Sequence, residues 1–276
     1  MSVPLYKFVS TPKWRQLVAA EDSFYSRAIS LCDQAILSLN QAMDDGSLND
    51  DQYYFLSYLL SRPSLSLKDV TVICLSLFSD GLSTTTPTLL FNLHCLAAWT
   101  EVQDKVYAEV KEHFPAQDQP IHQNTLAKMQ YLKAFVKETF RLWPNGTEVS
   151  RYCEDDLVLS GYQIPSGTHL DLNPSVHFRD PVIFPDPDVH IPERWIRDGH
   201  GQDVHPYILT PFGHGTRMCA GRRFAEQDLY VVLGRLLQRF HLEYGENEMD
   251  DKNHLGQVYN TLLFPDRPLK IKFMPR

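Results

Sequence analysis

The stretch that decides the fold of this chain is Pro211-Phe212-Gly213-His214-Gly215-Thr216-Arg217-Met218-Cys219-Ala220-Gly221-Arg222-Arg223-Phe224-Ala225-Glu226. It predicts a glycine-containing loop followed by an amphipathic helix, because the apolar residues after the loop recur at helical spacing as far as Phe240. A thiol at the start of a helix meets unpaired backbone N–H groups and the positive end of the helix dipole, and both favour the thiolate. Cys219 is therefore the candidate functional residue of this stretch.

A lone cysteine in an arbitrary chain is most often a small buried hydrophobe. Here, however, the pattern Phe-x-x-Gly-x-Arg-x-Cys-x-Gly is filled at every fixed position. The positions are Phe212, Gly215, Arg217, Cys219 and Gly221. The stretch resembles the heme-binding signature of the cytochrome P450 family.

The resemblance implies heme b as cofactor, with Cys219 as the axial thiolate ligand of the iron. Such a ligand donates electron density to the iron and favours O–O cleavage. Loop glycines leave room for a flat ligand against the backbone, and an arginine provides a fixed positive charge for carboxylates. The resemblance therefore assigns Arg217 to a heme propionate, and Phe212, Gly213 and Gly221 to the walls of the cofactor site.

Composition and charge exclude several other classes of protein. A chain of 276 residues is long enough for one large domain or two small ones. Its net charge of −8 and pI near 5.7 argue against a nucleic-acid partner. Five scattered cysteines without a Cys-x-x-Cys pair are typical of a reducing compartment. We expect no transmembrane helix, because no run of eighteen apolar residues occurs, and the N-terminus shows no targeting signal.

The segment from Leu65 to Trp99 predicts a long helix, with Ser66 as its N-cap. Its middle contains Gly81, three threonines and Pro87, a composition that predicts either a simple kink or a space beside a ligand. The segment resembles the P450 helix that crosses the heme. The resemblance identifies Thr84 as the threonine of oxygen activation.

This helix departs from the family pattern at two positions. Asp80 stands where the family usually has Ala or Gly, and a carboxylate buried beside the heme would be costly without a partner. Ser83 stands where the family usually has an acid or an amide, which weakens the expected proton-delivery pair with Thr84. We expect altered or reduced oxygen activation from Asp80 and Ser83.

The segment from Tyr131 to Trp143 predicts a helix on which Glu138 and Arg141 share a face. Such a pair is usually a solvated bridge worth less than about 1 kcal/mol. Glu-x-x-Arg, together with Pro192-Glu193-Arg194-Trp195, resembles two further P450 segments. The resemblance implies a buried network of Glu138, Arg141 and Arg194 that holds the loop carrying Cys219.

The remaining segments indicate a mainly helical fold with small β hairpins, which resembles the P450 fold without much of its N-terminal half. We expect one partial P450 domain over residues 1–276. Its predicted parts are a helical part at 1–143, a meander of short strands and loops at 144–210, the heme-binding loop and following helix at 211–240, and a C-terminal hairpin at 241–276. In that hairpin, residues 261–264 are expected to pair with residues 269–273.

Four basic residues resemble the mitochondrial branch of the family: Lys133, Lys137, Arg222 and Arg223. On an acidic protein, such a patch suits an acidic ferredoxin as electron donor. The branch implies the matrix side of the inner mitochondrial membrane, a peripheral membrane contact, and a lipophilic, sterol-like or steroid-like substrate. Two functions remain open: a heme-dependent monooxygenase, or a shortened, non-catalytic chain that acts through interaction only.

Overall fold

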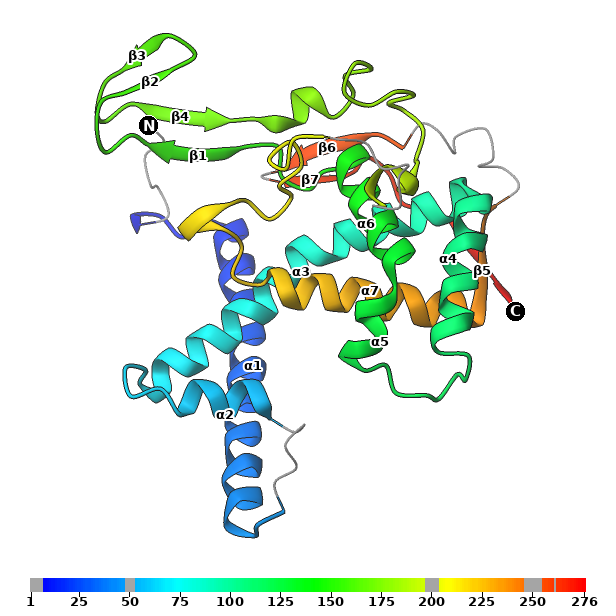
Figure 1. The fold of residues 1–276 in the computed structure, drawn as a ribbon. Coiled ribbons are helices and arrows are strands. Elements are labelled where there is room, and N and C mark those ends of the chain that lie inside the picture. The colour runs from blue at the N-terminus through cyan, green and yellow to red at the C-terminus, as the bar shows by residue number, and fades with distance from the viewer. Residues whose placement is uncertain (1–6, 48–52, 197–203, 246–254, 261) are drawn as a thin grey trace. The chain divides into compact units, whose positions relative to one another are not determined.

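The computed structural model describes residues 7–47, 53–196, 204–245, 255–260 and 262–276. The chain divides into two compact units, Met1–Asp80 and Gly81–Arg276. Most of the elements belong to the second unit, including those that carry the candidate site (Figure 1).

The first unit consists of α1 (Pro12–Asp44), α2 (Tyr54–Leu60) and the first part of α3 (Leu67–Ala98). Helix α1 begins where the Thr11 hydroxyl accepts a hydrogen bond from the Trp14 N–H. Helix α3 begins at the predicted cap, where Ser66 and Asp69 bond to each other's backbone N–H. The unit has a small core made of Ala28, Leu39, Leu59, Val70 and Leu75.

The second unit is built around α4 (Thr100–His113), α6 (Gln130–Leu142) and α7 (Arg222–Arg239), which pack against one another (Figure 1). The short helix α5 (Gln123–Lys128) also contacts α7. The largest buried side chains of this core include Phe91, Phe114, Phe135, Leu132 and Leu233. The predominantly helical architecture agrees with the predicted fold class. Within the described residues, no helix combines the length and the apolar composition needed to cross a membrane.

The strands of the described residues form four antiparallel pairs. The meander contains the pair β1 (Val149–Tyr152) with β4 (His169–Leu172) and the pair β2 (Leu157–Leu159) with β3 (Tyr162–Ile164). Ser160 and Gly161, both at positive φ, make the tight turn between β2 and β3. The C-terminal pairs are β5 (Phe240–Tyr244) with β8 (Ile271–Pro275) and β6 (Gln257–Asn260) with β7 (Leu262–Pro265).

The predicted C-terminal hairpin is wrong in its pairing. Both segments form strands, but β7 pairs with β6 and β8 pairs with β5. Strand β5 follows α7 directly and places the buried side chain of Leu242 opposite Phe273, so that it offers β8 an apolar partner. The Asp266 N–H donates to the Gly256 carbonyl at 3.0 Å, which joins the end of β7 to the start of β6. Position 261 lies outside the described residues.

Candidate functional site

The loop that carries Cys219 is closed by its own backbone. The N–H of Cys219 donates to the Phe212 carbonyl at 2.8 Å, and the N–H of Met218 donates to the Gly215 carbonyl at 3.1 Å. The second bond closes the short 3₁₀ helix η4 (Gly215–Arg217). The closed loop presents the thiol of Cys219 free and exposed, two residues before the Gly221 N-cap of α7.

Two of the loop glycines are required by the backbone itself. Gly213 has φ of 72° and Gly215 has φ of 79°, which is the left-handed region where a Cβ is strained. Gly221 differs, because its φ of −83° suits any residue. Arg217 is exposed at the end of η4. The loop therefore offers an accessible thiol, a backbone without Cβ atoms at two turns, and one accessible guanidinium.

Phe212 joins this loop to α6. Its ring packs edge-to-face on Phe140 with 5.3 Å between the ring centroids, and the guanidinium of Arg222 lies 5.8 Å from the centroid of the Phe212 ring. Phe140 is buried and directly precedes Arg141. The aromatic contact therefore connects the loop of Cys219 to the helix that carries the buried ion pair.

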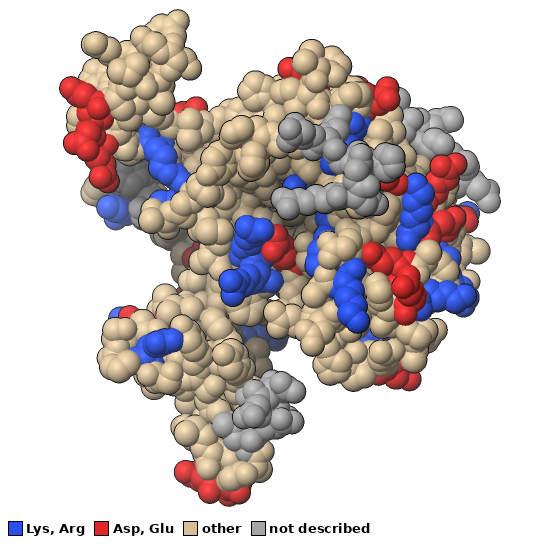
Figure 2. All heavy atoms as spheres, in the orientation of Figure 1, with Lys and Arg blue, Asp and Glu red and all other residues tan. Residues whose placement is uncertain are grey.

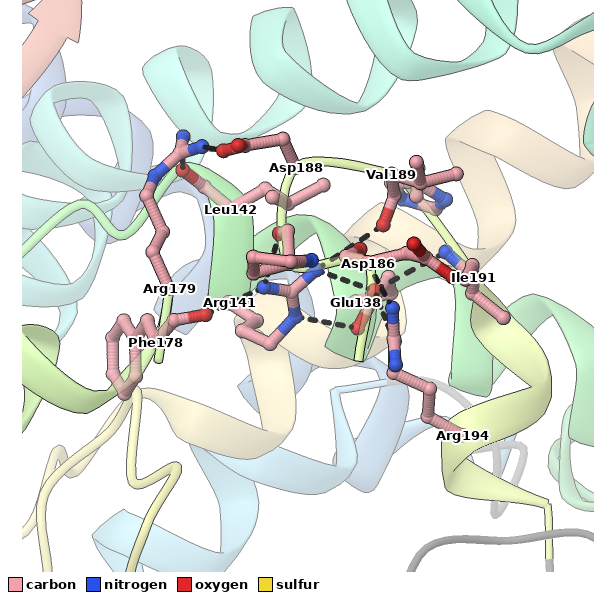
Figure 3. A network of polar contacts seen from close by, with 12 residues as sticks. Glu138, Arg141, Leu142, Phe178, Arg179, Asp186, Asp188, Val189, Ile191 and Arg194 are labelled. Atoms are coloured by element: carbon pink, nitrogen blue, oxygen red, sulfur yellow. Dashed lines mark hydrogen bonds and ion pairs between the residues drawn. The ribbon is translucent and has the colours of Figure 1, made fainter. Parts of the chain in front are cut away.

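Glu138 is the centre of a buried polar network (Figure 3). Arg141 donates from Nε to Oε2 at 3.0 Å and from Nη2 to Oε1 at 2.7 Å, while Arg194 donates from Nε to Oε1 at 3.2 Å. The Trp195 indole and the Ile191 N–H also donate to this carboxylate, at 2.8 and 3.1 Å. Neither side chain of the Glu138–Arg141 pair is exposed to solvent. The structure thus brings Glu138, Arg141 and Arg194 together in the interior of the protein.

The guanidinium groups of this network also bind the backbone of the meander. Arg141 donates to three carbonyl oxygens, those of Phe178 (2.6 Å), Pro187 (2.7 Å) and Val189 (3.2 Å). Arg194, on η3 (Pro192–Trp195), donates to the Asp186 carbonyl at 2.9 Å. Desolvation lowers the pKa of Arg194 from its ordinary value, and the charge of Glu138 opposes this shift.

This arrangement changes the predicted role of the network. Among the described residues, its hydrogen bonds end on the meander between Phe178 and Trp195 rather than on the loop of Cys219. That loop meets α6 through the contact between Phe212 and Phe140. Trp195 and Ile191 were missed as partners of Glu138. Trp195 lies in the quoted Pro-Glu-Arg-aromatic segment and could have been predicted. Ile191 bonds through its backbone N–H, which every residue except proline has, so its role could not be predicted from the sequence.

Helix α3 is continuous through the segment where a kink or a ligand space was predicted, since residues 67–98 are all helical despite Pro87. Asp80 and Ser83 are exposed and Thr84 is half-buried, so the carboxylate of Asp80 bears no cost of burial here. The carbonyl of Thr84 accepts hydrogen bonds from the Thr88 hydroxyl at 2.9 Å and from the Asn145 amide at 2.7 Å.

Asn145 is a second residue that the sequence patterns did not reveal. Besides its bond to α3, its carbonyl accepts the N–H of Leu263, in β7, at 2.8 Å. Asn145, which follows α6, thereby contacts the threonine segment of α3 through its side-chain amide and a C-terminal strand through its backbone carbonyl. Asparagine between Pro144 and Gly146 predicts only a turn, so its contacts with α3 and β7 could not be predicted from the sequence.

The four residues of the predicted basic patch lie on two helices, and three of them have partners within the described part of the chain. Lys133 donates to the Ala127 carbonyl at 2.7 Å, and Lys137 lies 4.1 Å from the centroid of the Trp195 ring. Arg222 pairs with Glu226 at 3.0 Å, and Arg223 is exposed beside it. Figure 2 shows Lys and Arg side chains mixed with Asp and Glu side chains on the face that carries α4 and α6. The patch is therefore local rather than a uniformly basic surface.

Comparison with known proteins identifies the class. The family model described as "Cytochrome P450" matches residues 1–273, and the chain belongs to this family.

Three relatives show how the chain relates to curated members of the family. It is 42% identical over 266 residues to "Probable cytochrome P450 CYP44" of Caenorhabditis elegans, covering 96% of this chain and 50% of the relative. It is 34% identical over 278 residues to "Cytochrome P450 10" of Lymnaea stagnalis, covering 100% and 49%. It is 31% identical over 273 residues to "Cholesterol side-chain cleavage enzyme, mitochondrial" of Hypanus americanus, covering 98% and 50%. The chain thus spans about half the length of these relatives.

Membership of this family implies a heme cofactor. The residues present fit such a group: an exposed cysteine is a thiolate donor for iron, and the two positive-φ glycines keep side chains away from a flat ligand. Arg217 offers a cation for a carboxylate.

Proposed function

We propose that this chain is the heme-carrying portion of a monooxygenase that places one atom of O₂ into a lipophilic substrate. The observation that carries the proposal is the exposed thiol of Cys219, presented by a loop that its own backbone bonds close. Bound heme supplies the activation of dioxygen, and a thiolate ligand favours O–O cleavage. Cys219 ligates the iron, and Arg217 pairs with a propionate.

In this proposal, α3 supplies protons. Asp80, Ser83 and Thr84 are three and four residues apart, so they share one side of the helix. The hydroxyl of Thr84 holds the proton that is delivered. Ser83 and Asp80 replace the residues that the family usually has there, and we expect them to lower the efficiency of delivery. Their exposure leaves both side chains accessible to water, which is the proton source.

The names of two relatives support a proposal for the substrate class and the compartment. One relative is named as a mitochondrial cholesterol side-chain cleavage enzyme, and another, from Drosophila melanogaster, is named "Probable cytochrome P450 12d1 proximal, mitochondrial". We therefore propose a sterol-like or steroid-like substrate, a mitochondrial location, and a ferredoxin that docks on Lys133, Lys137, Arg222 and Arg223. The names of the Caenorhabditis and Lymnaea relatives carry no such location.

A carbon monoxide difference spectrum tests the proposal. The chain is expressed with a heme supply, purified and reduced with dithionite, and we expect the red-shifted Soret band of a thiolate-ligated heme. Cys219→Ser should lose this band, while Cys32→Ser, which alters a cysteine of the first unit, should keep it. Absence of heme from the wild-type chain would overturn the proposal for this chain and favour the alternative, a non-catalytic chain that acts through interaction only.

The docking patch is tested on the heme-loaded chain by reduction with a ferredoxin. Lys133→Glu with Lys137→Glu should slow reduction several-fold at low salt, because the change removes an attraction that steers association. The matched control is Lys13→Glu with Lys68→Glu, which changes the net charge equally at two exposed positions of the first unit. Equal slowing by both double variants would mean that net charge, rather than this patch, determines the rate.

A further inference from the structure

Two cysteines of the first unit face each other across two helices. Cys32 lies on α1 and Cys74 on α3, and the side chain of Cys32 is close enough to act on the Cys74 thiol. Both are free and half-buried. Neither belongs to the heme-binding loop, so the pair raises a question separate from the proposed function.

The packing around the pair shows that the contact belongs to an interface between helices. Phe24 of α1 stacks on Phe78 of α3 with 5.7 Å between the ring centroids. On α1, the buried side chain of Ala28 precedes Cys32 by one helical turn. On α3, the buried side chain of Val70 precedes Cys74 by one turn. Figure 1 shows α1 beside the first part of α3. Each sulfur therefore lies next to core residues on the side where the two helices meet.

We propose that Cys32 and Cys74 are a reversible dithiol–disulfide pair that links α1 to α3. The oxidant is a small disulfide of the class of oxidised glutathione. The thiolate of one cysteine attacks a sulfur of that disulfide and releases one glutathione thiolate, which leaves a mixed disulfide. The second cysteine then attacks the protein sulfur of the mixed disulfide and releases the second glutathione thiolate. Two electrons pass to glutathione, and the two cysteine protons end on the two glutathione thiols.

The environment of Cys74 affects how readily its sulfur attacks. Burial raises the pKa of Cys74 above its ordinary value, and the neighbouring Cys32 sulfur raises it further. The thiolate is the nucleophile in thiol–disulfide exchange, so this shift slows an attack by Cys74. Exchange of this kind suits a reducing compartment, where intracellular disulfides are mostly transient and redox-sensing.

The other cysteines provide internal comparisons. Cys95 and Cys153 are buried, and burial raises the pKa of Cys95 far above its ordinary value. Cys219 is exposed, so it can form a mixed disulfide with glutathione. We expect oxidation to remove the thiols of Cys32 and Cys74 as a pair, to modify Cys219 singly, and to leave Cys95 and Cys153 reduced.

The experiment treats the folded, full chain with oxidised glutathione, blocks the remaining thiols, and maps the digested chain by mass spectrometry. The expected product is a peptide pair joined by Cys32 and Cys74 and separated again by dithiothreitol. In Cys32→Ser or Cys74→Ser, the remaining partner should stay as a glutathione adduct or as a free thiol. Cys219→Ser should leave the joined peptide unchanged. The proposal is overturned if Cys32 and Cys74 are found only free or separately glutathionylated, or if either is joined mainly to Cys219.

Because a serine variant can fold poorly, a second measurement uses the wild-type chain alone. Free thiols are counted with Ellman's reagent before and after treatment, and helical content is followed by circular dichroism. The expected result is loss of three thiols, those of the pair and that of Cys219, with the helical signal retained. Loss of the helical signal together with the thiols would show pairing in an unfolded chain and would also overturn the proposal. Neither readout depends on heme, so a failure here is distinguishable from a failure of the proposed function.

Discussion

Glu138 accepts five hydrogen bonds, from Arg141, Arg194, Trp195 and the backbone N–H of Ile191, at a site that water does not reach. A single carboxylate thereby balances one of two buried guanidinium charges. The low polarity of such a site makes each of these bonds strong, and it makes the loss of the anion costly. The stability of the meander therefore depends on one ionised side chain.

Glu138→Gln tests this dependence, because the amide keeps the shape of the carboxylate and removes its charge. We expect the free energy of unfolding to fall by about 3–5 kcal/mol, the cost of leaving a buried charge without its partner. Urea unfolding followed by tryptophan fluorescence measures it, since Trp195 lies in the network.

The matched control is Glu226→Gln, which neutralises one member of the exposed pair with Arg222. Exposed pairs of this kind contribute less than about 1 kcal/mol. Equal losses in the two variants would contradict the central role of the Glu138 network.

At the scale of elements, Gln103 of α4 joins three segments at one buried amide. Its Nε2 donates to the carbonyls of Leu96 in α3 and Leu242 in β5, both at 2.9 Å, and its Oε1 accepts the N–H of Leu242 at 2.7 Å. The middle of β5 is thus fixed by a side chain 139 residues away. Such contacts position the C-terminal strands on the helical core.

This contact explains which parts of the fold could be predicted from the sequence. Periodicity is local, so the helices α6 and α7 were predicted close to their observed bounds. Strand pairing is non-local. Strand β8 pairs with β5 rather than with its neighbour in sequence, β7, because β5 lies on the core. The motif spacing identified Glu138, Arg141 and Arg194, whereas Asn145 acts through a tertiary contact that no local pattern carries.

A substitution at Gly234 of α7 would show how tightly this helix packs against Phe114. A Cβ added there would lie 2.7 Å from the Cζ atom of Phe114, whose ring is fully buried. We expect Gly234→Ala to lower the free energy of unfolding by about 1–3 kcal/mol, as overpacking does, despite the higher helix propensity of alanine.

Gly81→Ala is the matched control, because Gly81 is also helical and nothing lies within 4 Å of its added Cβ. There the change should stabilise the protein by about 0.5–1 kcal/mol. Thermal unfolding of both variants measures the difference. A stabilising effect of Gly234→Ala would show that Phe114 moves aside freely.

At the scale of the whole molecule, two buried histidines make stability depend on pH. His94 contacts the Tyr244 hydroxyl through Nδ1, and His190 lies 3.0 Å from the Thr139 hydroxyl through Nε2. The other ring nitrogen of each is buried without a hydrogen-bond partner in the described part of the chain. Desolvation lowers the pKa of both histidines from 6.5 to about 3. The charge of His190 lowers the pKa of His94 further. The charge of Arg141 does the same to the pKa of His190. Both imidazoles are therefore neutral in the folded protein near pH 7.

Unfolding returns both histidines to their ordinary pKa. Below about pH 6.5 the unfolded chain therefore binds more protons than the folded chain. Stability is complete above that pH and falls as the pH decreases toward 3, by up to about 1.4 kcal/mol per pH unit for each histidine. Urea unfolding at several pH values between 7.5 and 5 measures the slope. His190→Phe should reduce it, whereas His122→Gln, at an exposed position, should leave it unchanged. Equal slopes in all three proteins would exclude the buried histidines as the cause.

The bonds from Arg141 to the meander have a consequence for how this region tolerates mutation. They end on main-chain oxygens, which every residue type possesses, rather than on side chains. The side chain of Val189 is exposed, and its backbone carbonyl is the group that accepts the hydrogen bond from Arg141. This position can therefore accept many residue types without a change in the backbone conformation of the loop. The chemical specificity of these three bonds lies in Arg141. A saturation scan should therefore find that Val189 accepts many residue types, whereas Arg141 accepts few.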